Sequence, residues 1–454
     1  MKVRGRSRSV ALLAIPALLL AACGSDDDEA GSTTPATASA DSNPTATASA
    51  DTTPADTTPA DTTPAPAATE PAETTPGTEA VAAPSGDPVK VMVMGSFTGP
   101  YDTSFSFDTA NAAAKAINDA GGIQGHPYEI LTCDDKFDPN ATLDCARQAA
   151  DAGVVAIIAG LALTGDYIDF AAQEGIPVIP AVGFNAAEFQ NDITFPLTSG
   201  AAGYATAAIA EVIAQGVTKI SLVYDDSSGL AKPGAETAAA ALEAQGIDVT
   251  NIIPMPIDIA DASSILAAAE ADGAEGAGLL LQGAQVAKFL QARDQSGSEI
   301  LVGSYDLSLE PAIIKTLGPA AEGVLMASPF KQLTTKGDPG VDQFFAELKA
   351  YDASISTDDW SIPGVGLGVY AATHLIGQAA QEAATLDAAG LLAVLPTIDT
   401  FDIGIMAPID LTTSNTTAVP GFTRLFNTKF YFNKIEGGIL VPLGDEPVDV
   451  LATS

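Results

Sequence analysis

The stretch Val89-Lys90-Val91-Met92-Val93-Met94 begins a regular alternation of apolar runs and alanine-rich stretches. It predicts a strand, and a helix over 105–119 and a second strand over 128–133 are predicted to follow. The alternation continues to Met326. Apolar strands separated by alanine-rich helices are typical of parallel sheets covered by helices on both faces. The sequence therefore predicts an α/β fold, and the restart of the pattern near Ser199 predicts two doubly wound parallel sheets.

The C-terminal part of the chain is less regular. A helix is predicted over 366–384, and strands are predicted over 421–425 and 429–432. In open parallel sheets, ligands bind beside the carboxyl ends of the strands. The loops expected to carry a site are therefore 95–102, 160–166, 180–185, 225–229, 282–285 and 303–307.

The N-terminus predicts export. Four basic residues precede an apolar run over 10–20, which is too short to span a bilayer and indicates a signal peptide over 1–22. The run ends in Leu20-Ala21-Ala22-Cys23-Gly24, which resembles the lipobox of bacterial lipoproteins. This resemblance implies that Cys23 carries acyl chains. The alternative is an ordinary signal cut after Ala22 that leaves Cys23 free.

Residues 24–87 predict a disordered linker. The segment consists almost wholly of Ala, Thr, Pro, Ser, Asp and Glu, and Asp-Thr-Thr-Pro-Ala recurs at Asp51, Asp56 and Asp61. Such a composition cannot bury enough apolar surface to fold, and its prolines favour extended conformations. As a flexible coil the segment spans roughly 45 Å, which is enough to hold a folded domain away from a membrane.

The folded part of the chain is strongly acidic. Residues 88–454 contain 15 of the 19 basic residues and 45 of the 57 acidic residues. A surface with this charge repels the phosphate backbone, so nucleic acid is not an expected partner.

Cys133 and Cys145 are the two cysteines of the folded part. In an oxidising compartment they predict a local disulfide, and two separate buried thiols are the alternative. With only His126 and His374 in the chain, no metal site and no cofactor are expected.

Seven motifs in chain order resemble the leucine/isoleucine/valine-binding family, the type I periplasmic binding proteins that serve ABC importers. They include Met94-Gly95-Ser96-Phe97-Thr98-Gly99-Pro100-Tyr101, Ala120-Gly121-Gly122-Ile123, Val154-Val155-Ala156-Ile157-Ile158-Ala159-Gly160 and Val223-Tyr224-Asp225-Asp226. The resemblance covers residues 88 to about 380. It implies two lobes joined by a hinge of three crossovers, with lobe 1 formed by 88–198 plus 329–420 and lobe 2 by 199–328 plus 421–454.

The resemblance also implies a place for a ligand carboxylate. In the family it meets a hydroxyl residue and backbone N–H groups after the third strand, where this chain has Thr164 at a helix N-terminus suited to anions. Capping that helix is the alternative role for Thr164. The next loop usually supplies another small hydroxyl residue, but here Phe184 stands at that place, followed by Asn185. The usual carboxylate pocket is therefore altered, although its backbone contacts can survive.

In lobe 2 the resemblance assigns Asp306 to a ligand ammonium group, and an exposed loop aspartate is the alternative. Ser228 stands where the family often has a tyrosine, and another family aromatic falls near Leu281 or Gln282. Aromatic residues are candidates for the walls of the site, with plain core packing as the alternative role: Phe97, Tyr101 and Tyr305.

The expected function is that of a lipid-anchored extracytoplasmic protein. It captures a small amino-acid-like solute between its lobes and delivers it to an ABC permease, as a monomer. A branched-chain amino acid, an amide, a urea-like solute and an aromatic acid are the candidate ligands. A sensory or adaptor lipoprotein is the alternative function. A hydrolase is not expected, because no G-x-S-x-G motif and no Ser/His/Asp arrangement is evident.

Overall fold

A computed structural model describes residues 82–98, 102–227, 229, 231–355 and 364–452. All of them belong to one compact unit, Gly77–Ser454. The predicted signal peptide, Cys23 and most of the predicted linker lie outside the described residues.

The first sheet has four parallel strands in the order β2-β1-β3-β4. Strand β1 (Val89–Gly95) lies between β2 (Tyr128–Asp134) and β3 (Ala156–Ala159), and β4 (Val178–Pro180) follows at the edge. In this register Val91 of β1 is level with Ile130 on one side and Ala156 on the other. A strand with neighbours on both sides and helices on both faces has no exposed face, which accounts for the continuous apolar runs.

The second sheet is separate from the first and has eight strands. Seven of them follow the order β11-β10-β9-β8-β7-β5-β6, and β12 pairs with β10. Its strands β5 to β9 are parallel, whereas β10 to β12 join as antiparallel strands. The strands have these bounds: β5 (Lys219–Asp225), β6 (Asp248–Met255), β7 (Gly276–Leu280), β8 (Leu301–Tyr305), β9 (Leu325–Ser328), β10 (Lys429–Glu436), β11 (Ile439–Pro442) and β12 (Val448–Asp449).

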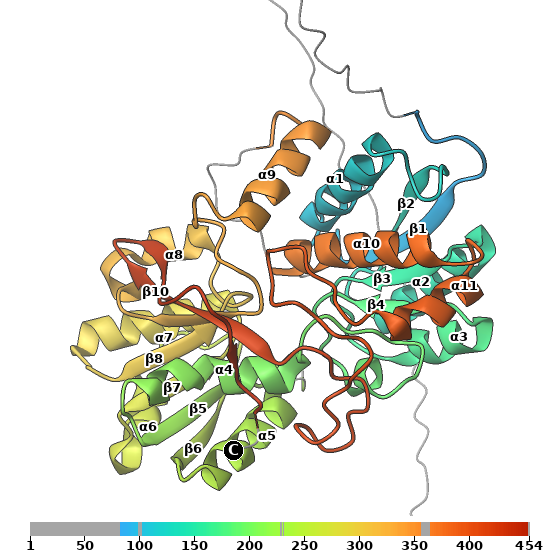
Figure 1. The fold of residues 1–454 in the computed structure, drawn as a ribbon. Coiled ribbons are helices and arrows are strands. Elements are labelled where there is room, and N and C mark those ends of the chain that lie inside the picture. The colour runs from blue at the N-terminus through green and yellow to red at the C-terminus, as the bar shows by residue number, and fades with distance from the viewer. Residues whose placement is uncertain (1–81, 99–101, 228, 230, 356–363, 453–454) are drawn as a thin grey trace, which may run out of the picture. The chain divides into compact units, whose positions relative to one another are not determined.

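The helices divide between the two sheets (Figure 1). The first sheet is associated with α1 (Phe105–Asp119), α2 (Pro139–Ala152), α3 (Asp166–Glu174), α9 (Pro339–Tyr351), α10 (Gly364–Glu382) and α11 (Ala388–Val394). The second is associated with α4 (Gly200–Ala214), α5 (Ala231–Ala244), α6 (Ser263–Ala269), α7 (Gly283–Ser296) and α8 (Pro311–Leu317). The chain therefore passes between the sheets three times, which confirms the predicted α/β fold class. The exact lobe boundaries stay a prediction.

Local sequence explains where the helices begin and end. At α2 the side chain of Asp138 accepts hydrogen bonds from the backbone N–H groups of Asn140 and Ala141, both at 3.0 Å, and Pro139 occupies the first helical position. Gly153 ends the helix in the left-handed conformation at φ 66°. Aspartate before proline and glycine after the last turn are the expected start and stop signals. Asp338 and Pro339 repeat the same start at α9.

The predicted strand over 421–425 is wrong. The backbone N–H groups of Thr423 and Arg424 both donate to the carbonyl oxygen of Phe189, at 2.9 and 3.0 Å, instead of to a neighbouring strand. Phe422 stacks on Phe189 with ring centroids 4.5 Å apart. These loop contacts partly bury alternate side chains of the segment. Its pattern of burial therefore resembles that of a strand, although the segment pairs with no neighbouring strand.

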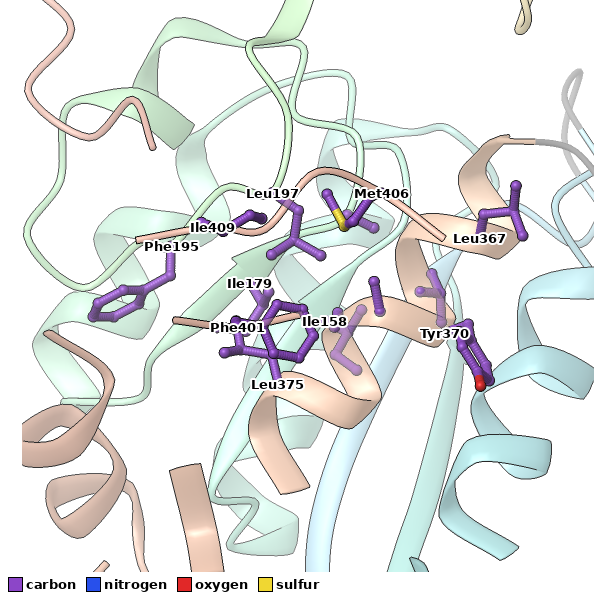
Figure 2. Packing of buried hydrophobic residues seen from close by; sticks show 14 of the residues in the cluster. Ile158, Ile179, Phe195, Leu197, Leu367, Tyr370, Leu375, Phe401, Met406 and Ile409 are labelled. Carbon is purple, nitrogen blue, oxygen red and sulfur yellow. The ribbon is translucent and has the colours of Figure 1, made fainter. Parts of the chain in front are cut away.

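The first sheet packs against α10 through a continuous apolar core (Figure 2). Figure 2 shows Ile158 and Ile179 from the strands close to Leu375 of the helix, and all three are fully buried. Close packing requires glycine at Gly368 of α10, where a side chain would come within 2.6 Å of the carbonyl oxygen of Ala181. A side chain at Gly377 would come within 2.6 Å of only the flexible end of Ile117, which can move aside. The core therefore holds α10 firmly over the sheet.

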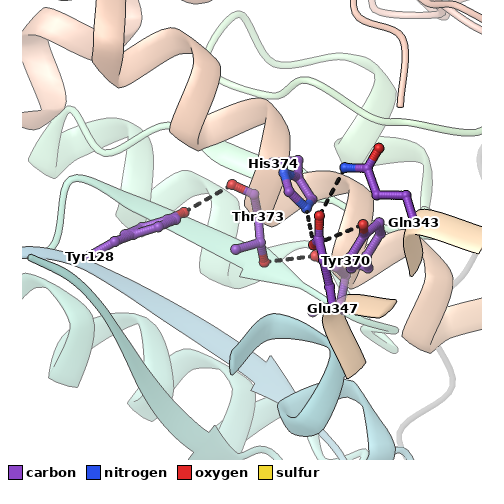
Figure 3. A network of polar contacts seen from close by, with 7 residues as sticks. Tyr128, Gln343, Glu347, Tyr370, Thr373 and His374 are labelled. Atoms are coloured by element: carbon purple, nitrogen blue, oxygen red, sulfur yellow. Dashed lines mark hydrogen bonds and ion pairs between the residues drawn. The ribbon is translucent and has the colours of Figure 1, made fainter. Parts of the chain in front are cut away.

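A polar network connects α9 to α10 (Figure 3). The carboxylate of Glu347 accepts hydrogen bonds from the Tyr370 hydroxyl at 2.9 Å and from Gln343 Nε2 at 2.8 Å, and it lies 2.9 Å from His374 Nε2. Burial opposes ionisation of Glu347, but these partners hold its pKa below the usual value. The network gives His374, one of the two histidines of the chain, a structural role between these helices.

The predicted disulfide between Cys133 and Cys145 is confirmed, with Cα atoms 5.6 Å apart. It connects the end of β2 to α2, next to Asp134, whose carboxylate accepts a hydrogen bond of 2.9 Å from the backbone N–H of Phe97. In the described part of the chain, no helix has the length and hydropathy needed to cross a bilayer. Over the same residues, no cluster of three His, Cys, Asp or Glu side chains could hold a metal ion.

Candidate functional site

A cavity of about 430 Å³ lies at the carboxyl ends of strands from both sheets. Each of the six loops expected from the sequence contributes to its lining, through Asp102, Leu161, Phe184, Asp225, Gln282 and Tyr305 respectively. Its volume is in the range of small-molecule sites, and most of its exposed surface is apolar. This cavity is the candidate binding site.

Asp306 is the central polar group of the site. It follows β8, its Oδ2 accepts a 2.7 Å hydrogen bond from the Ser328 hydroxyl group, and its Oδ1 is buried without a hydrogen bond of normal geometry. Burial raises the pKa of Asp306 to about 7, against the opposing effects of the Ser328 hydroxyl and the backbone N–H of Leu307. Rotation about χ2 of aspartate is soft, so either oxygen can turn toward a ligand. A cationic group would complete the hydrogen bonding of this carboxylate.

Asp225, at the end of β5, lines the same cavity but is already satisfied. It accepts hydrogen bonds from the backbone N–H and the hydroxyl group of Ser227, at 3.0 and 2.9 Å. Gln282 Nε2 and Gln285 Nε2 donate to the same carboxylate, at 2.7 and 3.2 Å. Four donors stabilise the charge internally, so Asp225 serves to fix the loop that carries Gln282.

Phe184 forms part of the wall after β4, and a buried carboxylate holds its loop in place. Glu188 is 1% exposed and accepts hydrogen bonds from the backbone N–H groups of Phe184 at 2.6 Å and Asn185 at 3.0 Å. The Tyr167 hydroxyl donates to the other oxygen of Glu188 at 2.8 Å. Burial raises the pKa of Glu188 to about 7, although all these donors act in the opposite direction.

An aromatic cluster lies behind the cavity wall. The ring of Tyr204, on α4, stacks on Phe184 at 5.7 Å and meets Tyr305 edge to face at 5.3 Å. Phe430 of β10 closes the cluster at 5.2 Å from Tyr204. Because Tyr204 is only 1% exposed, it supports the two wall residues from behind.

The first turn of α10 forms another wall, through Gly364, Val365 and Leu367. A side chain at Gly364 would come within 2.6 Å of Asp306 Oδ2, so only glycine leaves the carboxylate its present place. The helix N-terminus beside it also favours a negative charge.

The segment between β9 and α9 contributes Lys331, Gln332 and Leu333. Lys331 Nζ is paired with Asp338 at 2.7 Å, whereas Gln332 Nε2 is buried without a partner. Gln332 therefore offers a ligand one hydrogen-bond donor.

The structure brings together four of the predicted site residues, Phe184, Gln282, Tyr305 and Asp306, in the lining of one cavity. Thr164 and Asn185 do not line it. The N-cap of α3 is Gly165, so Thr164 does not cap that helix, and its hydroxyl group is buried without a partner. Tyr101 and Ser228 lie outside the described residues. The ligand-binding role of all these residues stays a prediction.

Sequence reasoning missed three groups of residues that shape the site. Glu188 stands among alanines in a segment that resembles an exposed turn, and Gln332 stands in an irregular segment. The glycines at the start of α10 were visible as Gly364-Val365-Gly366-Leu367-Gly368, a spacing that indicates close helix packing.

A family model described as periplasmic binding protein matches residues 88–427. A search of curated proteins found no significant match. Among solved structures, a branched-chain amino acid ABC transporter protein from Thermus thermophilus with bound valine is 19% identical, with a TM-score of 0.63 over 80% of this chain and 98% of that chain.

Two further solved structures are each 16% identical to the chain. A fatty acid ABC transporter substrate-binding protein from Thermomonospora curvata has a TM-score of 0.63 over 83% of this chain and 96% of its own. An ABC transporter solute-binding protein from R. palustris in complex with 4-hydroxybenzoate has a TM-score of 0.62 over 80% and 97%. At these identities the likeness shows the fold alone, and valine and 4-hydroxybenzoate share a carboxylate group but differ in the rest of the molecule.

Proposed function

Because the chain belongs to the periplasmic binding protein family of ABC transporter solute-binding proteins, we propose that it captures an amino-acid-like organic solute and delivers it to an ABC permease. The family consists of extracytoplasmic binding proteins rather than enzymes. The observation that carries the proposal is the cavity itself, with the incompletely hydrogen-bonded carboxylate of Asp306 in its lining. A solute with a cationic or N–H donor group would pair with Asp306 while its apolar part contacts the walls.

Capture works by closure of two lobes on the solute. Lining residues follow strands of both sheets, so a bound solute contacts both at once. A permease can then distinguish the loaded protein from the empty one, because the solute stabilises the closed arrangement. Reporting on the solute to a membrane receptor is the second candidate function, since it uses the same closure.

A thermal-shift screen of the full chain tests solute capture. The panel consists of amino acids, amides, amines and small organic acids. A ligand at a hundred times its Kd is expected to add about 2.7 kcal/mol to the free energy of unfolding. Asp306→Asn is expected to abolish the shift, and Asp342→Asn, which alters an exposed carboxylate that does not line the cavity, is the matched control. Absence of any shift across the panel would contradict the proposal.

The proposed anchor is a lipid on Cys23, followed by the linker over 24–87. Cells that express the chain and are fed a radiolabelled fatty acid are expected to label the wild type but not Cys23→Ser. Release of Cys23→Ser into the medium or periplasm, with solute binding retained, would separate the anchor from the site. Labelling of both forms would contradict the anchor.

A further inference from the structure

We propose that the solute is an apolar amine, a molecule with an ammonium group on a hydrocarbon body and no carboxylate group. This inference rests on the proposed capture of a solute in this cavity, and among the candidate solutes it selects amines over amino acids. An α-amino acid carries both an ammonium and a carboxylate group, so the question is whether the cavity can stabilise both charges.

The loop that would receive a carboxylate is already occupied by one. The backbone N–H groups of Phe184 and Asn185, after β4, are donors that a ligand carboxylate at this wall would need, yet both donate to Glu188, at 2.6 and 3.0 Å. Glu188 is 1% exposed, so these bonds are shielded from water. A ligand carboxylate would find no free donor on these two groups, and above pH 7 it would lie close to a buried acid of the same charge.

The side chains that line this wall give a carboxylate no compensation. Phe184 and Leu161 present apolar surface to the cavity, and the unpartnered polar groups of Thr164 and Asn185 lie outside the lining. Burying a carboxylate against hydrocarbon without donors is strongly unfavourable. An ammonium group at the opposite side and an apolar body at this wall fit these surfaces.

The charges of the described lining favour a cation. Four carboxylates line the cavity, and only one cationic side chain does: Asp102, Asp225, Asp306 and Glu310, against Lys331. Lys331 Nζ is 2.7 Å from Asp338, so its charge is already paired. Of the carboxylates, Asp225 has four internal donors, which leaves Asp306 with its partnerless oxygen as the partner for an ammonium group. An ammonium group of the ligand can therefore donate the hydrogen bond that Asp306 lacks. A ligand anion would be repelled by the lining carboxylates.

The size and chemistry of the walls call for a hydrocarbon body. The cavity of about 430 Å³ is much larger than an ammonium group, and its apolar walls include Leu280, Leu309, Val365 and Leu367. Each additional buried methylene group is expected to raise affinity about fourfold until the cavity is full. Gln332 Nε2 adds one neutral donor, which suits a hydroxyl, ether or amide oxygen on the body.

The acidic surface supports the same class of solute. With 45 acidic and 15 basic residues in the folded part, the field around the protein attracts small cations and repels small anions.

The test compares ligands that differ only in charge. One set contains 3-methylbutylamine, leucine and 4-methylpentanoate, and the other contains 2-phenylethylamine, phenylalanine and 3-phenylpropanoate. Calorimetric titration of the full chain is expected to show that the amine of a set binds at least about tenfold more tightly than the amino acid, with no binding of the acid. Equal or tighter binding of the amino acid or the acid would overturn the inference while leaving solute capture intact. Absence of binding by these sets and by the whole thermal-shift panel would overturn both.

A variant series tests the assigned cause. At pH 8, above the pKa of about 7 that burial gives Glu188, Glu188→Gln removes the internal negative charge while keeping an acceptor for the backbone N–H groups, and it is expected to lower the preference for amine over amino acid at least about tenfold. Glu347→Gln alters another hydrogen-bonded, partly buried carboxylate that does not line the cavity, and it is expected to leave the preference unchanged. If both variants leave the preference unchanged, Glu188 does not determine the class of ligand.

Discussion

The hydroxyl group of Ser328 donates a 2.7 Å hydrogen bond to one carboxylate oxygen of Asp306, whose other oxygen is buried without a partner. Burial makes this carboxylate costly to keep ionised in the folded protein. A cationic ligand at this carboxylate would therefore stabilise its ionised form. Two predictions follow from this relationship between stability and binding.

Asp306→Asn is expected to stabilise the empty protein at pH 8 by about 1–3 kcal/mol, because a neutral amide costs less to bury than a carboxylate. The folded-state pKa of Asp306, about 7, lies above its unfolded value of 3.8. Its contribution to stability is thus fully present below about pH 4 and is lost as the pH rises through 7. Urea denaturation at pH 5 and pH 8 measures the difference between variant and wild type. An equal difference at both pH values would contradict the assignment.

Amine affinity is expected to rise as the pH increases from about 5.5 to 8, because Asp306 must lose its proton to pair with a cation. The other titratable groups described next to it are Tyr204 and Tyr305, and burial raises the pKa of Tyr204 well above its usual value. An alkylamine stays protonated over this range, so the change reports the protein. Titrations of Asp306→Asn at the same pH values provide the control, and a wild-type affinity that falls with rising pH would rule out Asp306 as the anionic partner.

Glu188→Ala is expected to lower the free energy of unfolding by about 3 kcal/mol or more. It leaves the Tyr167 hydroxyl and the N–H groups of Phe184 and Asn185 without their acceptor in a buried place. Tyr167→Phe removes only one of these donors and is expected to cost about 1 kcal/mol. Both values come from chemical denaturation at pH 6. A smaller effect for Glu188→Ala than for Tyr167→Phe would show that the carboxylate does not organise the loop.

Gly364→Ala is expected to reduce ligand affinity about tenfold or more, because the new Cβ atom would lie 2.6 Å from Asp306 Oδ2 and displace the carboxylate. Gly377→Ala on the same helix is the matched control. Its Cβ atom would meet only the flexible end of Ile117, so affinity is expected to stay the same. Calorimetry separates the two variants, and equal affinities would remove Gly364 from the site.

Replacing both Cys133 and Cys145 with serine is expected to lower stability by about 2–4 kcal/mol, since the disulfide closes a short loop of the unfolded chain. The melting temperature of the double variant, compared with the wild type under oxidising and reducing conditions, measures this contribution. Reduction should lower the melting temperature of the wild type and leave that of the double variant unchanged. If reduction lowers both equally, the disulfide is not the source of the difference.

Much of the fold was predictable because buried parallel strands appear as apolar runs, such as 154–158, between alanine-rich helices. The loops at the strand ends were predictable for the same reason, since topology alone places them along one edge of each sheet. The segment 421–425 was wrong because loop contacts to Phe189 imitate the pattern of a strand. The roles of Glu188 and Gln332 depend on which groups surround them in the folded chain. The hydrophobic periodicity of the sequence carries no information about those neighbours.

Glu188 also has a consequence for competition. A free carboxylate in solution must compete with one that the chain holds covalently at the same N–H groups, at an effective concentration of at least about millimolar. Solutes at micromolar levels cannot overcome such an intramolecular rival without much better contacts elsewhere. The Glu188 side chain would therefore exclude a ligand carboxylate while leaving room for an ammonium group elsewhere in the cavity. Under the proposed function, its substitution would allow the preference to change from amines to amino acids in one step.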